Sequence, residues 1–142
     1  MKLYVASHSL EKAQEMRDLL LQRGHEVTSR WITEDSKFHL PGDAYTPDER
    51  EKIAVMDEAD VRLAGDGVVV LSEESGRCVP GGKHVEAGIA LGLGRPVYVV
   101  GHRENIFHWH PRVRVFGDAH QLLGYLARLE ECSAAPPEGT QA

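Results

Sequence analysis

The 142-residue sequence has few cysteines, fewer basic than acidic residues, and no long apolar run. Its two cysteines, Cys78 and Cys132, are too few for a disulfide-stabilised scaffold and do not form a CxxC zinc-binding pair. This usage fits the reducing cytoplasm, where we expect the protein to be located. No apolar stretch approaches the ~20 residues of a membrane span, and the N-terminal MKLYVASHSL has no signal-peptide cleavage site. We therefore expect no membrane partner.

The charge balance excludes a second class of partner. The chain has 16 lysine and arginine residues against 22 aspartate and glutamate residues, a formal net charge of -6. A broad basic surface that follows the phosphates of DNA or RNA is not expected, so we predict no nucleic acid polymer as partner. A small phosphorylated ligand needs only a local cationic patch and stays open.

Apolar segments alternate with helical segments along the chain. Residues 67–71 and 96–100 are apolar without alternation, which is typical of strands covered on both faces in a parallel sheet. Thr46-Pro47-Asp48-Glu49 has the pattern of a capping box with proline at the first helical position. The sequence predicts strands at residues 3–6, 26–31, 67–71, 96–100 and 113–116, and helices at residues 10–23, 47–64, 82–93 and 119–130.

This order predicts one doubly wound α/β domain, flavodoxin- or Rossmann-like, with about five parallel strands and helices on both faces of the sheet. We place the domain at residues 1–131 and a disordered tail at residues 132–142, and we expect residues 33–45 to form a loop near the site. In such folds the ligand lies beyond the carboxyl ends of the strands. The loops after Ala6, Leu71 and Gly101 converge on that edge.

The stretch GGKHVEAGIALG places one carboxylate, Glu86, near the start of a helix. The unsatisfied N–H groups and the dipole of a helix N-terminus favour an anion, so we expect Glu86 to be ionised at neutral pH. Its helical sector is that of Val85, Ile89 and Ala90, which directs it toward the sheet edge. Such a carboxylate can act as a nucleophile. The simpler interpretation is a glutamate that only stabilises the helix dipole.

A second helix, at residues 47–64, carries acids on its apolar side. Asp57 and Asp60 fall inside the arc of its apolar stripe, which includes Ile53, Met56 and Val61. An acid on a core-facing stripe either finds strong donors or opens onto a pocket, where a raised pKa would suit a general acid. The alternative is that one of these acids caps a neighbouring loop.

Four segments resemble the nucleoside 2-deoxyribosyltransferase superfamily, which includes the deoxynucleoside 5'-monophosphate N-glycosidases. They are LYVAS, MDEADVRLAGDGVVVL, GGKHVEAGIALGLGRPVYVVG and GHRENIFHWHP, and the likeness spans residues 1–116. A tyrosine in the first strand (Tyr4), an aspartate nine residues before a strand-opening aspartate (Asp57 and Asp66), and a glutamate in a glycine-flanked helix start (Glu86) occur in the family's order.

The resemblance implies that the protein cleaves the N-glycosidic bond of a nucleoside or its 5'-monophosphate by a retaining double displacement. Glu86 would form a covalent glycosyl ester, Tyr4 would orient it, and Asp57 would protonate the departing base. Asp66 would be structural. One ionised and one protonatable carboxylate flanking the sugar suit an oxocarbenium-like transition state. The sugar would pass to water or to another base, and no cofactor is expected.

The sequence also departs from the family. Family transferases carry a base-gripping acid six residues before the nucleophile, a position that Pro80 occupies here. The glycosidases have a glycine- and arginine-rich first loop, which SHSLEK replaces. Candidate groups for binding the substrate, including a 5'-phosphate, are therefore Ser7, His8, Ser9, Ser75, Arg77, Gly82 and Lys83. The alternative for Arg77 and Lys83 is a solvated loop.

The pair His108 and His110 suggests a metal site if the two residues share one face of a strand, but no third ligand has matching spacing, so we expect no metal. The resemblance implies a homo-oligomer, dimer or higher, and Ile106, Phe107 and Trp109 supply apolar contact area. Two rivals stay open: a non-catalytic nucleotide-binding module of the same fold, and a flavodoxin-like FMN binder whose phosphate loop is SHSLEK.

Overall fold

A computed structural model of the chain describes residues 1–33, 44–74, 79–136 and 139. Five strands form one sheet in the order β2-β1-β3-β4-β5, and each neighbouring pair is parallel. The strands are β1 (Lys2–Ala6), β2 (Glu26–Val27), β3 (Val68–Leu71), β4 (Val97–Val100) and β5 (Val113–Phe116). The predicted fold class is confirmed.

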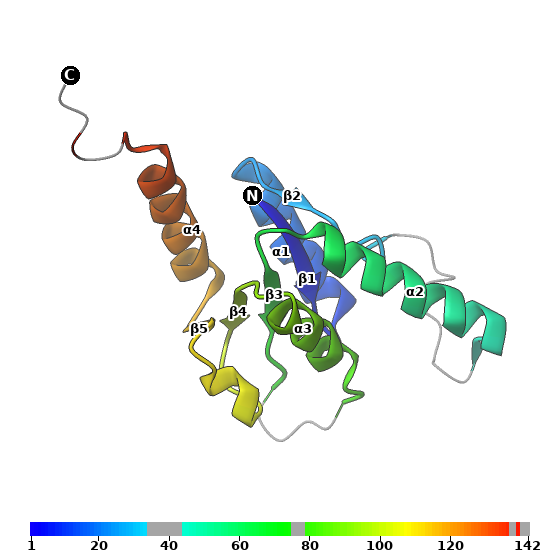
Figure 1. Cartoon of the computed structure of the whole chain (residues 1–142). Helices are drawn as coiled ribbons and strands as arrows, with labels where there is room; N and C mark the ends of the chain where they lie inside the picture. Colours follow the sequence, from blue (N-terminus) through cyan, green and yellow to red (C-terminus); the bar gives the residue numbers. More distant parts are fainter. Residues whose placement is uncertain (34–43, 75–78, 137–138, 140–142) are drawn as a thin grey trace.

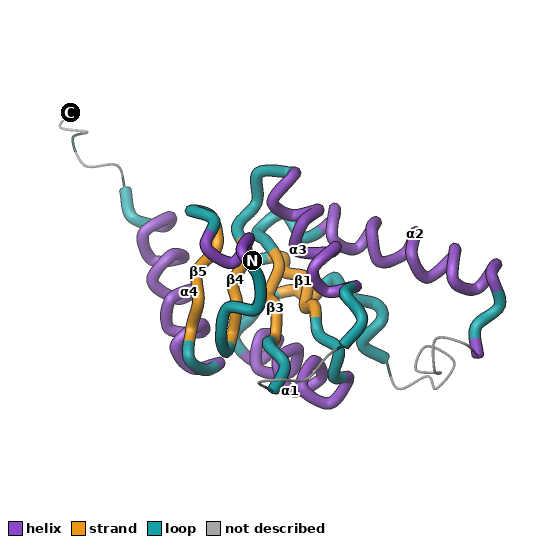
Figure 2. Tube along the Cα trace, turned by 90° about the horizontal axis from the view of Figure 1, so that it is seen from below, coloured by secondary structure: helices purple, strands orange, loops and turns teal. Residues whose placement is uncertain are grey.

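Four helices cover the two faces of the sheet (Figures 1 and 2). They are α1 (Leu10–Gln22), α2 (Pro47–Leu63), α3 (Gly82–Gly92) and α4 (Ala119–Ala134). Side chains alternate along β1, so that Leu3 and Val5 pack with α1 and α4, while Tyr4 and Ala6 pack with α2 and α3. The two faces therefore have separate cores, and the residue Tyr4 belongs to the α2–α3 side.

The helix starts follow from their caps. The Thr46 hydroxyl accepts a hydrogen bond from the Glu49 N–H at 3.2 Å, and the Glu49 carboxylate accepts one from the Thr46 N–H at 3.1 Å, as the capping-box prediction requires. Ser9 caps α1, and Asp118 caps α4. Helix α4 ends at Ala134, so residues 132–134, which the sequence assigned to the tail, are helical. Most of the remaining tail lies outside the described residues.

The predicted strand at residues 26–31 is too long, because β2 ends at Val27. Beyond it, the Thr28 N–H still donates to the Leu3 carbonyl at 2.9 Å, and side chains then continue the contact with β1. The N–H of Val5 donates to the Ser29 hydroxyl at 2.7 Å, and the Trp31 indole donates to the Val5 carbonyl at 2.9 Å. The segment therefore stays bound to β1 without strand geometry.

The histidine pair does not lie on a strand either. Residues Ile106–Trp109 form a 3-10 helix, η3, whose start is capped by the Asn105 side chain, which accepts from the Phe107 N–H at 2.9 Å. His108 is buried and its Nδ1 accepts from the Glu104 N–H at 3.0 Å. The assumption that His108 and His110 share one face of a strand is therefore wrong.

The loops after β3 and β4 meet at the carboxyl edge of the sheet. The Ser72 hydroxyl donates to the His102 carbonyl at 2.6 Å and accepts from the His102 N–H at 2.9 Å. Gly101 permits this contact: its φ is +123°, and a Cβ atom there would lie 2.7 Å from the Ser72 Cβ. Two of the three loops expected at this edge are thus joined directly.

This contact predicts that Gly101→Ala destabilises the fold more than Gly94→Ala. Gly94 also has a positive φ, +75°, but nothing lies within 4 Å of a Cβ there. Alanine at Gly94 should cost about 1 kcal/mol from backbone strain alone, whereas alanine at Gly101 adds a clash and should cost about 3 kcal/mol. Chemical denaturation of the two variants measures the difference, and equal losses would contradict the close packing of the two loops.

In the described part of the chain, no helix combines the length and apolar character needed to cross a bilayer.

Candidate active site

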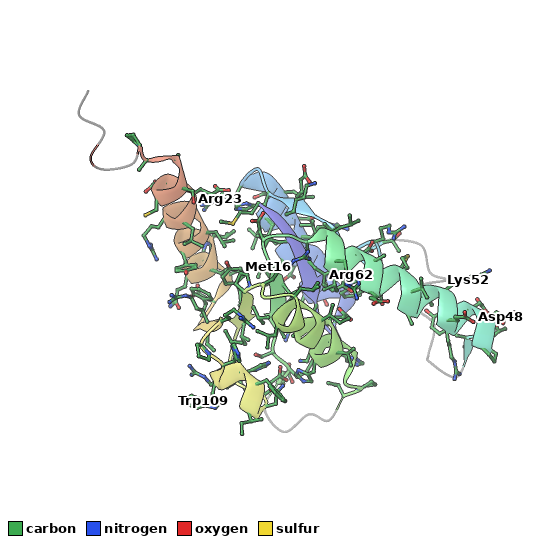
Figure 3. The ribbon with its side chains drawn as sticks, viewed as in Figure 1. Met16, Arg23, Asp48, Lys52, Arg62 and Trp109 are labelled. Atoms are coloured by element: carbon green, nitrogen blue, oxygen red, sulfur yellow. The ribbon has the colours of Figure 1, made fainter. Side chains whose placement is uncertain are left out.

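A cleft of about 750 Å³ lies between α2 and α3. It exists because α2 is buried against the sheet only near its C-terminal end, at Asp60 and Val61, while its N-terminal half projects from the body (Figure 1). Asp48 and Lys52 mark that projecting end in Figure 3. The walls of the cleft are largely apolar and are formed by Ile53, Ala54, Val85 and Ile89, together with Tyr45, Arg50, Asp57, Glu58, Gly82 and Glu86. Asp57 and Glu86 thus face one cavity from opposite helices.

Glu86 is the fifth residue of α3 and lies beyond its first turn. Its Oε2 atom is buried and has no hydrogen-bond partner among the described residues. Burial raises the pKa of Glu86 to about 8, the Asp57 carboxylate adds to the increase, and the Tyr4 hydroxyl opposes it. The expectation that Glu86 is ionised at neutral pH is therefore wrong, because the helix N-terminus is one turn away and burial dominates.

Tyr4 lies fully buried on β1, and the phenol faces the two carboxylates. Among the residues that the structure describes, none offers its hydroxyl a hydrogen-bond partner within 3.5 Å. Burial first, and then the charges of Glu86 and Asp57, raise the pKa of Tyr4 well above its usual range. The phenol is therefore a permanent O–H donor, near enough to Glu86 for each group to shift the pKa of the other.

Asp57 and Asp60, the two acids on the apolar stripe of α2, have different environments. Asp60 is fully buried and its carboxylate accepts from the Arg30 backbone N–H at 2.9 Å and side chain at 2.8 Å, so it holds a neighbouring loop. Asp57 has a buried Oδ1 with no partner among the described residues. Burial and the nearby Asp60 raise the pKa of Asp57 to about 6, and Arg30 partly opposes them. Of the two alternatives, capping therefore applies to Asp60 and the pocket to Asp57.

A smaller hollow of about 260 Å³ borders the same two carboxylates on the side of the β1 loop. Ser7, His8, Gly82 and Lys83, four of the predicted substrate-binding residues, line it. The Ser9 hydroxyl instead accepts from the Lys12 N–H at 3.3 Å as the cap of α1. The hollow is more polar than the large cleft, and the two share both acids. The predicted residues Ser75 and Arg77 lie outside the described residues.

Lys83 has a different role from the predicted one. Its ammonium group is buried and donates to the Leu71 carbonyl at 3.1 Å, to Glu73 Oε1 at 3.5 Å and to Glu104 Oε1 at 2.8 Å. A lysine has three donors, and these partners use all of them. No donor of Lys83 is left for a substrate phosphate in this arrangement.

Sequence reasoning missed two residues at the site. Arg50 lines the outer part of the cleft, and its seven-residue spacing from Asp57, two helical turns on one face, was a usable signal. Glu104 binds Lys83 from the loop after β4. The sequence signal for Glu104 was its position just after a strand whose carboxyl end was predicted to border the site.

Comparison of the chain with protein-family models gives no match, and comparison with curated proteins gives none. The site is therefore interpreted from its own geometry. Within residues 1–33, 44–74, 79–136 and 139, no three His, Cys, Asp or Glu side chains are arranged to hold a metal ion.

The raised pKa of Glu86 predicts a pH-dependent loss of stability that Glu86→Gln removes. The folded pKa, about 8, exceeds the ordinary value of 4.5, so between these values the native state binds more protons than the unfolded state. The free energy of unfolding therefore falls as pH rises through that window. From pH 5 to pH 9 the wild type should lose about 2 to 4 kcal/mol more than the variant.

Denaturant titrations at several pH values measure this difference. The matched control is Glu131→Gln, which changes an exposed glutamate on the opposite face of the sheet and should keep the wild-type pH dependence. An equally steep decline in Glu86→Gln would show that the buried carboxylate is not its source.

Proposed function

We propose that the protein cleaves the N-glycosidic bond of a nucleoside or nucleoside 5'-monophosphate, with Glu86 as nucleophile and Asp57 as general acid. The observation that carries this proposal is the pair of carboxylates at the inner end of one cleft, each with a buried oxygen that has no partner among the described residues. Buried carboxylates without donors are costly, which points to a ligand or reaction that uses them. The order of Tyr4, Asp57 and Glu86 in the resembling family agrees with these roles.

The reaction proceeds in two displacements. Glu86 attacks the anomeric carbon, an ester bond forms, and the bond from that carbon to the base nitrogen breaks. The electron pair leaves with the base, which takes the proton of Asp57. A water molecule, or a nitrogen of a second base, then attacks the anomeric carbon from the opposite face and displaces Glu86, while Asp57 accepts the proton of the attacking group. Both carboxyl groups return to their starting states, and the configuration at the sugar is retained.

The protonation of the pair suits this sequence. With pKa values of about 6 and about 8, Asp57 and Glu86 together hold one proton near pH 7. Catalysis requires that this proton be on Asp57 and that Glu86 be ionised. Positive charge that develops on the sugar favours the Glu86 anion, and the Tyr4 O–H is placed to donate to it.

The two cavities differ in polarity, as do the base and the sugar-phosphate end of a nucleotide. The larger cleft presents apolar side chains from both helices, such as Ile53 and Ile89, and suits a flat base. The smaller hollow is bordered by Ser7 and His8 and suits the sugar hydroxyls or a 5'-phosphate. The anomeric carbon then lies between Asp57 and Glu86, which border both cavities.

The proposal includes a homo-oligomer, dimer or higher. Three apolar side chains of η3 are strongly exposed: Ile106 at 79%, Phe107 at 67% and Trp109 at 70%. They lie at the periphery of the molecule, where Figure 3 marks Trp109. Exposed apolar side chains grouped on one short helix support a protein–protein interface there.

The deciding experiment measures covalent catalysis by Glu86. Glu86→Ala and Glu86→Gln should fold and lose at least about 10³-fold in glycosidic cleavage, because binding energy alone cannot replace a covalent nucleophile. Intact-mass spectrometry with a 2'-fluoro nucleoside or nucleotide should show a sugar adduct on the peptide that contains Glu86. Product analysis with and without an acceptor base separates transfer from hydrolysis.

Glu131→Gln serves as the control and should keep wild-type turnover. An adduct on another residue would reassign the nucleophile. Nucleotide binding without any turnover in the wild type would favour the non-catalytic module.

The role of Asp57 predicts a dependence on the leaving group. Asp57→Asn should be severely impaired on natural nucleosides, because the amide keeps a hydrogen bond but cannot deliver an acidic proton. On a nitrophenyl 2-deoxyriboside, whose aglycone leaves as a stable anion, Asp57→Asn should recover much of its rate while Glu86→Gln should not. Equal losses of kcat/KM on both substrates would mean that Asp57 only positions the sugar or supports the fold.

A further inference from the structure

A buried ion cluster lies beside the carboxylate pair and takes no part in the proposed chemistry. We define the Lys83 cluster as Lys83, Glu73 and Glu104. The Lys83 ammonium is 2 to 3% exposed and binds both oxygens of Glu104, at 2.8 and 3.0 Å, and Glu73 at 3.5 Å. The Glu104 carboxylate also accepts from the Glu73 N–H at 3.3 Å. Every charge of the cluster therefore has a partner.

The cluster joins three segments of the chain. Lys83 belongs to the first turn of α3, Glu73 follows β3, and Glu104 follows β4. The ammonium also donates to the carbonyl of Leu71, the last residue of β3. The start of α3 is thereby fixed to the carboxyl edge of the sheet at both of these strands.

This fixation replaces a helix cap. Gly81, the N-cap residue of α3, provides no side-chain hydrogen bond, whereas the N-cap residues of α1, α2 and α4 do. The two glycines Gly81 and Gly82 also allow the backbone many conformations at this point. Two side chains hold this turn: Lys83, and His84, whose Nδ1 lies 3.1 Å from Asn105 Nδ2. Glu86 follows Lys83 one turn later on the same helix.

Stability alone is a weak reason for such a cluster. Three charges lose hydration on burial, and well-packed apolar residues of similar volume are often equally stabilising or more so. Unlike apolar contacts, the hydrogen bonds of an ion cluster are directional, and each one fixes the distance between two particular atoms.

We propose that the Lys83 cluster positions Glu86, by holding the first turn of α3 at the distance from β1 and α2 at which Glu86 faces both Tyr4 and Asp57. Glu104 and Lys83 are then positioning residues, and Lys83 is not a phosphate ligand. This inference rests on the proposed function for its effect on turnover, but its effect on the environment of Glu86 does not depend on that function.

The test compares Glu104→Leu with Glu104→Gln. The glutamine still accepts from the ammonium, and Glu73 still balances the charge, so turnover should stay within about twofold of wild type. Leucine removes the acceptor, so kcat should fall about 10- to 100-fold while KM changes little, because small displacements of a reacting group are costly. The control for loss of an ion pair is Glu130→Leu. Glu130 lies on α4, and its carboxylate pairs with the N-terminal ammonium of Met1.

A second readout needs no activity. The titratable groups that shift the pKa of Glu86 are Tyr4 on β1 and Asp57 on α2. Burial and the Asp57 carboxylate raise that pKa and the Tyr4 hydroxyl lowers it, so displacing Glu86 should change it, and NMR titration of the side-chain carboxyl carbon can measure the change. Both Glu104 variants remove the same negative charge, so a Glu86 pKa that differs between Glu104→Leu and Glu104→Gln reports displacement alone.

Equal kcat values and equal Glu86 pKa values in the two Glu104 variants would overturn the proposal. If Glu104→Leu does not fold, Lys83→Met combined with Glu73→Gln and Glu104→Leu removes every charge of the cluster and should fold. Wild-type kcat and an unshifted Glu86 pKa in that variant would also overturn it. If the wild type cleaves no nucleoside or nucleotide, the proposed function fails, while the pKa comparison still decides the positioning role.

Discussion

Glu86 and Asp57 each keep a buried carboxylate oxygen without a hydrogen-bond partner in the described structure, at the edge where β1 and β3 end. Burial raises the pKa of both groups, and the Asp57 carboxylate raises the pKa of Glu86 further. The fold tolerates this unfavourable arrangement because the two faces of the sheet carry separate apolar cores that do not involve either acid. The unfavourable electrostatics is confined to one cleft.

The neighbouring carboxylates are satisfied, which makes the two acids distinctive. Asp60, one turn from Asp57, is fully buried and bound to Arg30, and Glu104, across the edge from Glu86, is bound to Lys83. The same chain therefore supplies donors to neighbouring carboxylates and leaves two without them. A general shortage of donors does not explain this selectivity, whereas the ligand site proposed above does.

The local rules of capping and apolar patterning predicted the fold. Thr46 and Glu49 form their capping box, and β5 has the predicted bounds, because both depend on neighbours in sequence. The failures depend on contacts distant in sequence. Strand β2 is short because Ser29 and Trp31 bind β1 through their side chains, and Lys83 is occupied because Glu104 reaches it from 21 residues away. The protonation of Glu86 could not be predicted from helix position, since it depends on how deeply the tertiary fold buries the carboxylate.

The placement of Asp57 and Glu86 in one cleft could be anticipated, because both lie on apolar sides of helices that cover one face of the sheet. The second hollow could be anticipated only in part. Ser7 and His8 line the hollow as expected from their position in the loop after β1. Ser9, in contrast, caps α1, and Gly82 reaches the cavity through the packing of α3. Sequence order indicates which loops meet at an edge but not which donors remain available there.

Helix α2 contacts the sheet only near its C-terminal end, which gives it the geometry of a lever with its pivot at Val61. At 1.5 Å per residue, Asp57 lies about 6 Å from that pivot and Arg50 about 16 Å. A tilt of the helix would therefore displace the outer wall of the cleft nearly three times as far as the acid. In such a tilt the width of the outer cleft would change more than the separation of the two carboxylates.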